Sequence, residues 1–119
     1  EIMFRSWSIT HSLMINDLNI GLYDTSVNKG FKDYANDDHW AIMQYAGVKD
    51  KNQNRIFEGD ILSFSQQLVV VFFNESQACF DIEYMGGDCD VLVNQDGLTD
   101  MWEIVGNIYE NPEILTDKQ

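Results

Sequence analysis

Hydrophobic and polar residues alternate in short runs along most of the chain, as they do in β-strands with one buried face. In residues 78–84, apolar side chains alternate with two acidic ones, Asp81 and Glu83. Residues 68–73 are apolar at every position and rich in valine, so we expect this strand to lie at the centre of a sheet, buried on both faces. Both patterns predict sheet rather than helix.

Further short runs extend this prediction over most of the sequence. The other expected strands are residues 2–7, 13–15, 40–45, 61–64, 91–93 and 102–109, and a β-hairpin is expected over residues 47–58 around the polar tip Asp50–Asn54. Residues 16–39 have no clear pattern, and we expect a long loop there with one helical turn near residues 31–34. Short strands separated by turns are typical of a β-sandwich or a small barrel.

The length of 119 residues fits one domain, which can bury an ordinary core. We predict a single, mainly β domain, in which residues 1–39 supply N-terminal strands and the long loop and residues 40–119 a barrel-like β part. The longest apolar run, residues 68–73, is far shorter than the roughly 20 residues that cross a membrane. The N-terminus has the pattern of a strand rather than of a signal peptide, so we expect a soluble, cytoplasmic protein.

The charge of the chain is strongly acidic and unevenly distributed. Twenty Asp and Glu residues oppose seven Lys and Arg, and the formal net charge is −13. The segment between Arg55 and Lys118 contains no Lys or Arg and thirteen acids: Glu58, Asp60, Glu75, Asp81, Glu83, Asp88, Asp90, Asp96, Asp100, Glu103, Glu110, Glu113 and Asp117. Such a field repels the phosphates of nucleic acids and anionic membranes, so we expect neither as a direct partner. A partner recognised by charge would be a basic protein surface or a cation.

The residues most often used in catalysis and metal binding are few here and lie in no known motif. His11 and His39 fit no metal-binding spacing, and we interpret both as exposed loop residues. Cys79 and Cys89 are far enough apart to face each other across a hairpin, but two cysteines make no disulfide framework, and we expect reduced, partly buried thiols. Nothing in the sequence supports a nucleophilic pair of either thiol with His39.

A group of carboxylates follows the predicted turn at residues 86–88. Asp88 and Asp90, with Asp96 and Asp100 further on, could offer oxygen ligands to a hard cation, but the spacing of a calcium-binding loop is absent. We interpret these acids as solvated loop residues. We therefore predict no catalytic, cofactor-binding or metal-binding residue and no cofactor.

Three segments of the chain resemble the YopX family of phage and prophage proteins. Residues 4–7 are similar to the family's opening F-R-A-W, and residues 43–52 with 56–61 to M-Q-Y-T-G-L-K-D-K-N-G followed by I-Y-E-G-D-I. Residues 104–113 resemble I-G-N-I-Y-E-N-P-E. The hairpin glycine of the family is replaced by Gln53, which adopts a positive φ less readily, so we expect a longer turn or one shifted onto Asn52 or Asn54.

The resemblance implies an SH3-like small barrel in the C-terminal part, a small, irregular N-terminal subdomain and a phage or prophage origin with expression in a bacterial cytoplasm. It provides no activity and no functional residue. The motifs themselves are interpreted as structural: Gly47, Gly59 and Gly106 at turns or bulges, with Tyr45, Ile56, Ile61, Ile108 and Tyr109 at core and strand positions.

Three functions remain open from the sequence. The first is a non-enzymatic protein-interaction module, whose acidic surface binds a basic host or phage protein. A variant of it is an acidic DNA mimic that inhibits a host nucleic-acid-binding protein, although acid excess also serves solubility alone. The second is a structural protein that acts as a homo-oligomer. The third is an enzyme, for which no motif is present.

Overall fold

The protein is described by a computed structural model in which residues 3–18, 23–24, 29–30, 40–92 and 101–116 are placed. The chain divides into two compact units, Glu1–Tyr45 and Ala46–Gln119. The predicted fold class is confirmed, because the placed residues form mainly antiparallel strands, and the helix among them is a single short one, α2 (Glu113–Thr116). Strand β5 (Trp40–Lys49) continues across the boundary between the units.

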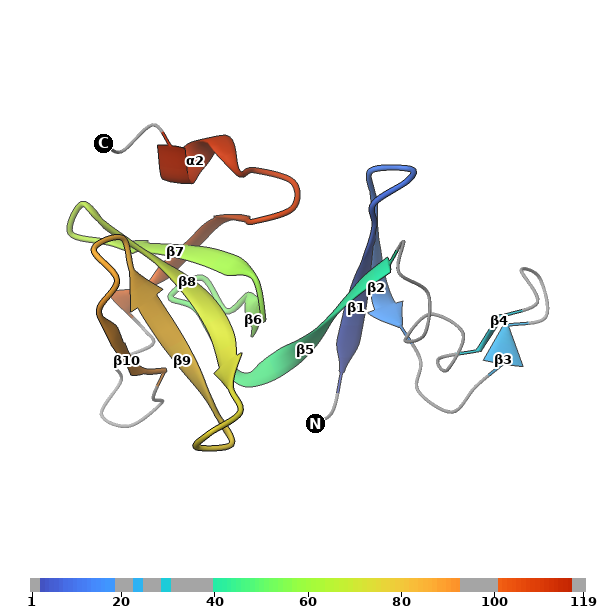
Figure 1. The fold of residues 1–119 in the computed structure, drawn as a ribbon, viewed down its shortest axis with the longest axis horizontal. Coiled ribbons are helices and arrows are strands. Elements are labelled where there is room, and N and C mark those ends of the chain that lie inside the picture. The colour runs from blue at the N-terminus through green and yellow to red at the C-terminus, as the bar shows by residue number, and fades with distance from the viewer. Residues whose placement is uncertain (1–2, 19–22, 25–28, 31–39, 93–100, 117–119) are drawn as a thin grey trace. The chain divides into compact units, whose positions relative to one another are not determined.

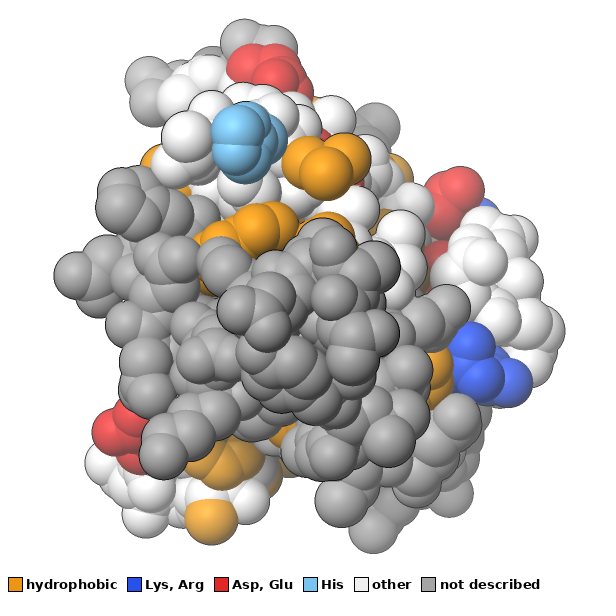
Figure 2. Space-filling model, turned by 90° about the vertical axis from the view of Figure 1, so that its right-hand side faces the viewer, with side chains coloured by type: hydrophobic (Ala, Val, Ile, Leu, Met, Phe, Trp, Pro, Cys, Tyr) orange, Lys and Arg blue, Asp and Glu red, His pale blue; other side chains and the backbone are white. Residues whose placement is uncertain are grey.

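The first unit is built on an antiparallel hairpin of β1 (Phe4–Ser8) and β2 (Leu13–Leu18), and β1 pairs on its other side with β5. The turn between β1 and β2 is stabilised by Ser8, whose Oγ accepts the backbone N–H of His11 at 3.1 Å. This arrangement confirms the strands expected at residues 2–7 and 13–15. Two exposed apolar side chains, Ile9 and Leu13, flank the turn, and Figure 2 shows hydrophobic side chains at the surface beside the histidine.

The long loop expected over residues 16–39 is wrong in part. Strand β2 extends to Leu18, and β3 (Tyr23–Asp24) pairs with β4 (Lys29–Gly30) in a small two-stranded sheet. Two-residue strands are too short to leave a period in the sequence, which is why the pattern did not reveal them. The helical turn expected near residues 31–34 lies outside the described residues.

The second unit is organised around a five-stranded antiparallel sheet in the order β10-β9-β8-β7-β11. The strands are β7 (Asp60–Phe64), β8 (Gln67–Asn74), β9 (Cys79–Tyr84), β10 (Cys89–Val91) and β11 (Glu103–Asn107). The valine-rich β8 is the central strand, as its continuous apolar run predicts. The unit also contains β6 (Arg55–Phe57), which follows β5 in the predicted hairpin.

The core of the second unit lies on one face of this sheet. It is formed by Ile56, Leu62, Val69, Val71, Ile82 and Trp102, with the partly buried Ala46, Val48, Phe80, Tyr84, Leu92 and Ile104 packed against it. Side chains of this size each contribute about 1.5–3 kcal/mol when fully buried. The strands of the sheet therefore depend on a shared core contributed by residues far apart in the sequence.

The sheet of the second unit curls, as the path of β7, β8 and β9 in Figure 1 shows. Over the described residues it is open between its two edge strands, β10 and β11. The curled sheet establishes part of a barrel, and the SH3-like form stays a prediction. The three glycines occupy the expected positions: φ is +88° at Gly47 and +84° at Gly59, and Gly106 lies at an irregularity in the pairing of β11 with β7.

The turn of the β5–β6 hairpin corrects one expectation. Gln53 itself has the positive φ, +68°, that the family's glycine would supply, and neither Asn52 nor Asn54 takes it over. The backbone N–H of Gln53 donates to the carbonyl of Asp50 at 3.0 Å, and Asp50 donates its own backbone N–H to Asn54 at 2.9 Å. These bonds fix the geometry of the tip, and the surrounding turn therefore forces a glutamine into a conformation that glycine prefers.

Candidate functional site

Three of the acids that dominate the sequence of the second unit are buried and have structural roles. Asp50 is 0% exposed, and its Oδ1 accepts the backbone N–H groups of Asn52 and Asn54 at 2.9 Å each, while its Oδ2 accepts that of Ile104 at 3.0 Å. Asp60, also buried, accepts the backbone N–H of Phe57 at 2.8 Å. These carboxylates hold turns and strands together and are not available to a ligand.

Asp81, the third, lies on the face of β9 opposite Phe80 and Ile82, as the alternation predicts, and it is buried there. It is 5% exposed, and its carboxylate accepts hydrogen bonds from Asn74 Nδ2 at 2.8 Å and from the thiol of Cys79 at 3.3 Å. A buried carboxylate is tolerated when hydrogen bonds replace the water that it loses. Alternation alone could not show that a polar cluster forms on this side of β9.

The last family motif also has a structural explanation. Asn107 Oδ1 accepts the backbone N–H groups of Tyr109 and Glu110, and Asn107 Nδ2 donates to Glu110 Oε1 at 2.7 Å. The side chain of Asn111 accepts the backbone N–H of Asn107 at 3.2 Å, and a Cβ on Gly106 would lie only 2.7 Å from the same Oδ1 of Asn111. The motif therefore encodes the turn that follows β11.

The two cysteines are free thiols and do not face each other. Cys89 pairs in register with Glu83, four positions along β9 from Cys79. The hydrogen bond to Asp81 is the main reason why the pKa of the Cys79 thiol is raised. Cys79 is partly buried as expected, whereas Cys89 is exposed, which corrects the expectation of two partly buried thiols. Desolvation of its thiol, followed by the negative charges of Glu83, Asp81 and Asp88, raises the pKa of Cys89. Neither environment activates a thiol as a nucleophile, because nucleophilic cysteines have a lowered pKa.

The other residues considered for chemistry lie apart from any described cluster. His11 is exposed at the β1–β2 turn, as expected, whereas His39, Asp96 and Asp100 lie outside the described residues. Within the described part of the chain, no group of three or more His, Cys, Asp and Glu side chains could hold a metal ion. In the same residues, no helix is long and apolar enough to cross a membrane.

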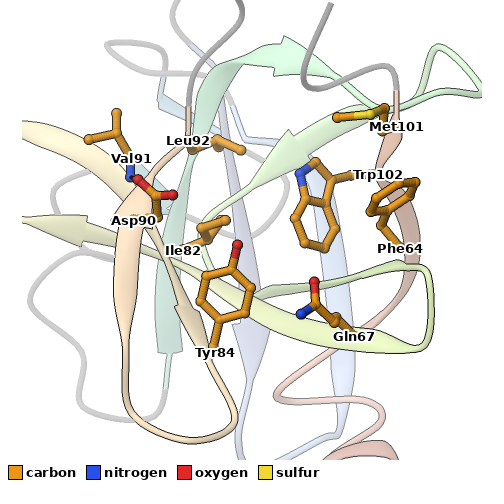
Figure 3. A pocket seen from close by; sticks show the side chains of 9 residues that line it. All are labelled: Phe64, Gln67, Ile82, Tyr84, Asp90, Val91, Leu92, Met101 and Trp102. Carbon is orange, nitrogen blue, oxygen red and sulfur yellow. Dashed lines mark hydrogen bonds between the residues drawn. The ribbon is translucent and has the colours of Figure 1, made fainter.

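An apolar hollow of about 290 Å³ lies in the second unit, on the face of the sheet that carries the core. Phe64 at the end of β7, Met101 and Trp102 just before β11 form one of its sides. Figure 3 shows Tyr84 and Gln67 beside these three residues, with the ring of Tyr84 directed into the space between the walls. Phe64 packs edge-on against Trp102, with ring centroids 5.9 Å apart. This wall is therefore an ordered aromatic surface.

The opposite side of the hollow is formed by strand β10 and the residue that follows it. Asp90, Val91 and Leu92 lie there, with Ile82 of β9 at the base (Figure 3). Asp90 Oδ1 accepts the backbone N–H of Val91 at 2.8 Å, which holds this carboxylate at the mouth of the hollow. The lining thus combines an apolar floor with a few polar groups, as protein-binding and ligand-binding surfaces do.

A second hollow of about 280 Å³ adjoins the first, because Gln67 and Tyr84 line both. It extends along the start of β8 and the β9–β10 turn and is lined also by Gln66, Leu68, Met85 and Gly86. We refer to the two hollows together as the apolar groove. Eight large hydrophobic side chains are exposed among the described residues, and four of them line this groove: Phe64, Met85, Val91 and Met101. Such concentration of exposed apolar surface marks interaction sites.

One acidic residue, Asp90, lines the groove, and two more lie on the same hairpin: Asp88 in its turn and Glu83 on the face of β9 opposite Tyr84. Glu83, Asp88 and Asp90 are all exposed, and no Lys or Arg occurs in the sequence of β8, β9 or β10. The groove therefore combines an apolar surface with one acidic side chain, Asp90, on a hairpin whose strands carry no basic residue.

The sequence did not single out the groove residues. The alternation in residues 78–84 predicts Tyr84 on the apolar face of β9, where it lies, but the sequence predicts only strands at Trp102 and Phe64. They meet because β11 pairs with β7. Two residues so far apart in the chain leave no joint signal in a single sequence. The local signal that could have pointed to this site is the set of aromatic and methionine residues at strand ends, where burial is least complete.

Comparison with known proteins gives a family and a fold. The family model described as YopX protein matches residues 3–116. The crystal structure of protein EF1440 from Enterococcus faecalis is similar with a TM-score of 0.67 and 23% sequence identity, over 97% of this chain and 98% of that chain. At this identity the likeness shows the fold alone. The curated proteins include no match to the chain.

Proposed function

The chain belongs to the YopX family, and on that premise we propose that it is a non-enzymatic protein-interaction module that binds a basic protein. The observation that carries the proposal is the apolar groove, with its exposed Phe64, Met85, Val91 and Met101 beside an acidic hairpin. Interaction surfaces combine an apolar centre rich in aromatic residues and methionine with a polar rim. The groove has both parts.

The acidic hairpin favours a basic partner on physical grounds. Opposite charges across an interface increase the association rate and select against partners of the wrong charge. A net charge of −13 repels acidic proteins, nucleic acids and anionic membranes alike. We place the action of this module in the cytoplasm of a bacterium that carries the phage or prophage, in agreement with the family resemblance.

A DNA mimic is a narrower version of the same proposal, and the burial of the acids speaks against it. A phosphate-like row needs acids that are exposed and evenly spaced. Asp50, Asp60 and Asp81 are buried in hydrogen bonds, and Glu103 lies 3.4 Å from the amine of Lys51 in an ion pair. Of the exposed acids that remain in the described residues, Asp90 lines the apolar groove, which suits a mixed interface better than a purely electrostatic one.

A homo-oligomer is the alternative that has an observation of its own. Ile9 and Leu13 are each 55% exposed at the β1–β2 turn, and burying them against a second copy would stabilise a dimer. Light scattering across a range of protein concentrations tests this directly. A mass that rises with concentration in the wild-type protein and stays monomeric in Leu13→Ser would favour the oligomer.

The proposal is tested by capture from an extract of the bacterial host on the immobilised protein, followed by elution in steps of increasing salt. We expect a protein of basic isoelectric point that elutes progressively between about 0.05 and 0.5 M salt, because screening shortens the reach of the acidic field. Retention of the same partner at every salt concentration, or recovery of acidic partners only, would contradict a basic protein partner.

A further inference from the structure

The shape of the apolar groove restricts what can occupy it. Its two hollows, about 290 and 280 Å³, lie side by side and share Gln67 and Tyr84 as a common border. Each is at or below the lower end of the roughly 300–1,000 Å³ typical of sites that enclose a whole small molecule. Two small, adjoining hollows fit two neighbouring contacts of an extended chain better than one compact ligand.

The surface of the first hollow favours an apolar or aromatic side chain. Trp102 is 8% exposed and is in contact with the ring of Phe64, which is 40% exposed. Phe64 therefore provides most of the aromatic surface of this pair that solvent can reach. Met101 and Val91 extend this surface, and the hydroxyl of Tyr84 offers one hydrogen-bonding group within it (Figure 3). Aromatic anchors in such settings carry a large part of binding energy.

The charge around the groove selects against the most obvious other occupant, a second copy of this chain. Asp90 lines the first hollow, and Glu83 and Asp88 are exposed on the same hairpin. A second copy would bring its own net charge of −13 to this hairpin, and like charges at an interface oppose association. Lysine or arginine side chains flanking an apolar anchor would compensate these acids, and their aliphatic stems would cover part of the apolar rim.

Resting on the proposed function, we infer that the apolar groove binds an extended basic segment of the partner protein. The segment inserts an aromatic or aliphatic side chain beside Trp102 and Tyr84 and places lysine or arginine side chains against Asp90 and the neighbouring acids of the β9–β10 hairpin. The second hollow, between Gln67 and Met85, holds the next side chain on the same face of the segment.

Short peptides titrated into the isotope-labelled full chain test this inference by chemical-shift mapping. The probes are an acetylated and amidated Lys-Lys-Leu-Phe-Lys-Lys peptide, its charge-reversed form Glu-Glu-Leu-Phe-Glu-Glu and its apolar-deleted form Lys-Lys-Gly-Ser-Lys-Lys. We expect shifts at the amide groups of Tyr84, Val91 and Trp102 with the first peptide and at least about tenfold weaker binding of the other two. Shifts of equal size with the charge-reversed peptide, or shifts confined to other strands, would overturn the inference.

Two pairs of variants separate the groove from a general effect of charge or exposure. Phe64→Ser and Phe73→Ser each remove a partly exposed ring, 40% and 38% exposed, that packs edge-on against one aromatic neighbour, but only Phe64 lines the groove. Asp90→Asn and Glu75→Gln each remove one exposed negative charge, and only Asp90 lines the groove. We expect about tenfold weaker peptide binding for Phe64→Ser and about threefold for Asp90→Asn, with less than about twofold change in the two controls.

The spectrum of each variant shows whether it is folded, so a lost interaction is not confused with a lost fold. Equal binding by Phe64→Ser and Phe73→Ser would overturn the inference. This test can fail while the proposed function holds. If Phe64→Ser still captures the partner from host extract, the protein is an interaction module that binds through another surface. Capture that fails with the wild-type protein removes the proposed function itself.

Discussion

Buried carboxylates show at the residue scale why the acidic composition of this chain is not simply a surface property. Asp50 connects the tip of the β5–β6 hairpin to β11, since its two oxygens accept backbone N–H groups from both. Asp60 does the same within the β6–β7 turn. The family motif that contains both residues is therefore explained by backbone hydrogen bonding, and a search for function must turn to residues outside it.

Replacing Asp50 tests this structural role. In Asp50→Ala the N–H of Ile104 loses its acceptor in a partly buried position, and the hairpin tip loses two further bonds. We expect a loss of about 3 kcal/mol in the free energy of unfolding, measured by urea denaturation. Glu75→Ala, at an exposed turn position, is the control and should change stability by less than about 0.5 kcal/mol. Equal stability of the two variants would contradict the assignment.

Replacing Gln53, the turn residue with a positive φ, by glycine should raise the stability of the protein where replacing Asp50 lowers it. Gln53 has a φ of +68°, a conformation that costs any residue with a Cβ about 1–2 kcal/mol. Glycine avoids this cost, but the greater entropy of its unfolded chain offsets part of the stabilisation. Gln53→Gly should therefore stabilise the protein by about 0.5–1 kcal/mol in urea denaturation. Gln53→Ala keeps the Cβ and should leave stability nearly unchanged. Destabilisation by glycine would show that the glutamine side chain has a role of its own.

At the scale of elements, the turn after β11 depends on the absence of a side chain at Gly106. A Cβ there would lie 2.7 Å from Oδ1 and 2.9 Å from Cβ of Asn111, whereas a Cβ on Gly86 would meet no heavy atom within 4 Å. Gly106→Ala should cost about 1–3 kcal/mol of stability, and Gly86→Ala close to none. The two melting curves measured side by side check this, and similar losses in both would refute the explanation.

The β9–β10 hairpin allows its negative field to be measured through a thiol. Desolvation of the exposed thiol and the charges of Glu83, Asp81 and Asp88 raise the pKa of Cys89, so less thiolate is present at a given pH and alkylation is slowed. In a Cys79→Ser background, the rate of reaction with iodoacetamide should follow a pH profile displaced to higher pH than that of free cysteine. Glu83→Gln should move this profile to lower pH, and Glu75→Gln should not move it.

Salt provides the control for the electrostatic part of this effect. Screening weakens the contribution of the charges but not that of desolvation, so added salt should increase the alkylation rate of the wild-type thiol more than that of Glu83→Gln. A rate that is the same in both proteins at low salt would mean that desolvation alone sets the pKa of Cys89.

The elements were predictable where their signal is local. The apolar run of β8, the alternation in β9 and the glycine positions around the β5–β6 hairpin all lead to strands and turns that the structure contains. The position of the turn between β7 and β8 follows from the strands expected at residues 61–64 and 68–73, but its conformation was not predictable. Ser65 and Gln66 both have a positive φ there, +52° and +68°, without the asparagine or glycine that normally marks such a turn. Tertiary packing overrides residue preference at this point.

At the scale of the whole molecule, a candidate site depends on strand pairing that no local pattern encodes. The groove exists because β11 pairs with β7 and brings Trp102 against Phe64, while β10 pairs with β9 and places Asp90 opposite Ile82. Acidic side chains near it could be anticipated from composition, and its apolar floor could not. Of the exposed acids of the second unit, Asp90 is brought to this apolar surface by the pairing of β10 with β9.

The central claim is that this groove, and not the acidic charge as such, selects the partner. The most direct measurement is the amount of host protein retained, at one fixed low salt concentration, by the wild-type chain, Phe64→Ser and Phe73→Ser, whose net charges are identical. The claim predicts that Phe73→Ser retains the partner as the wild type does and that Phe64→Ser retains about a tenth as much. Equal retention by all three proteins would contradict it.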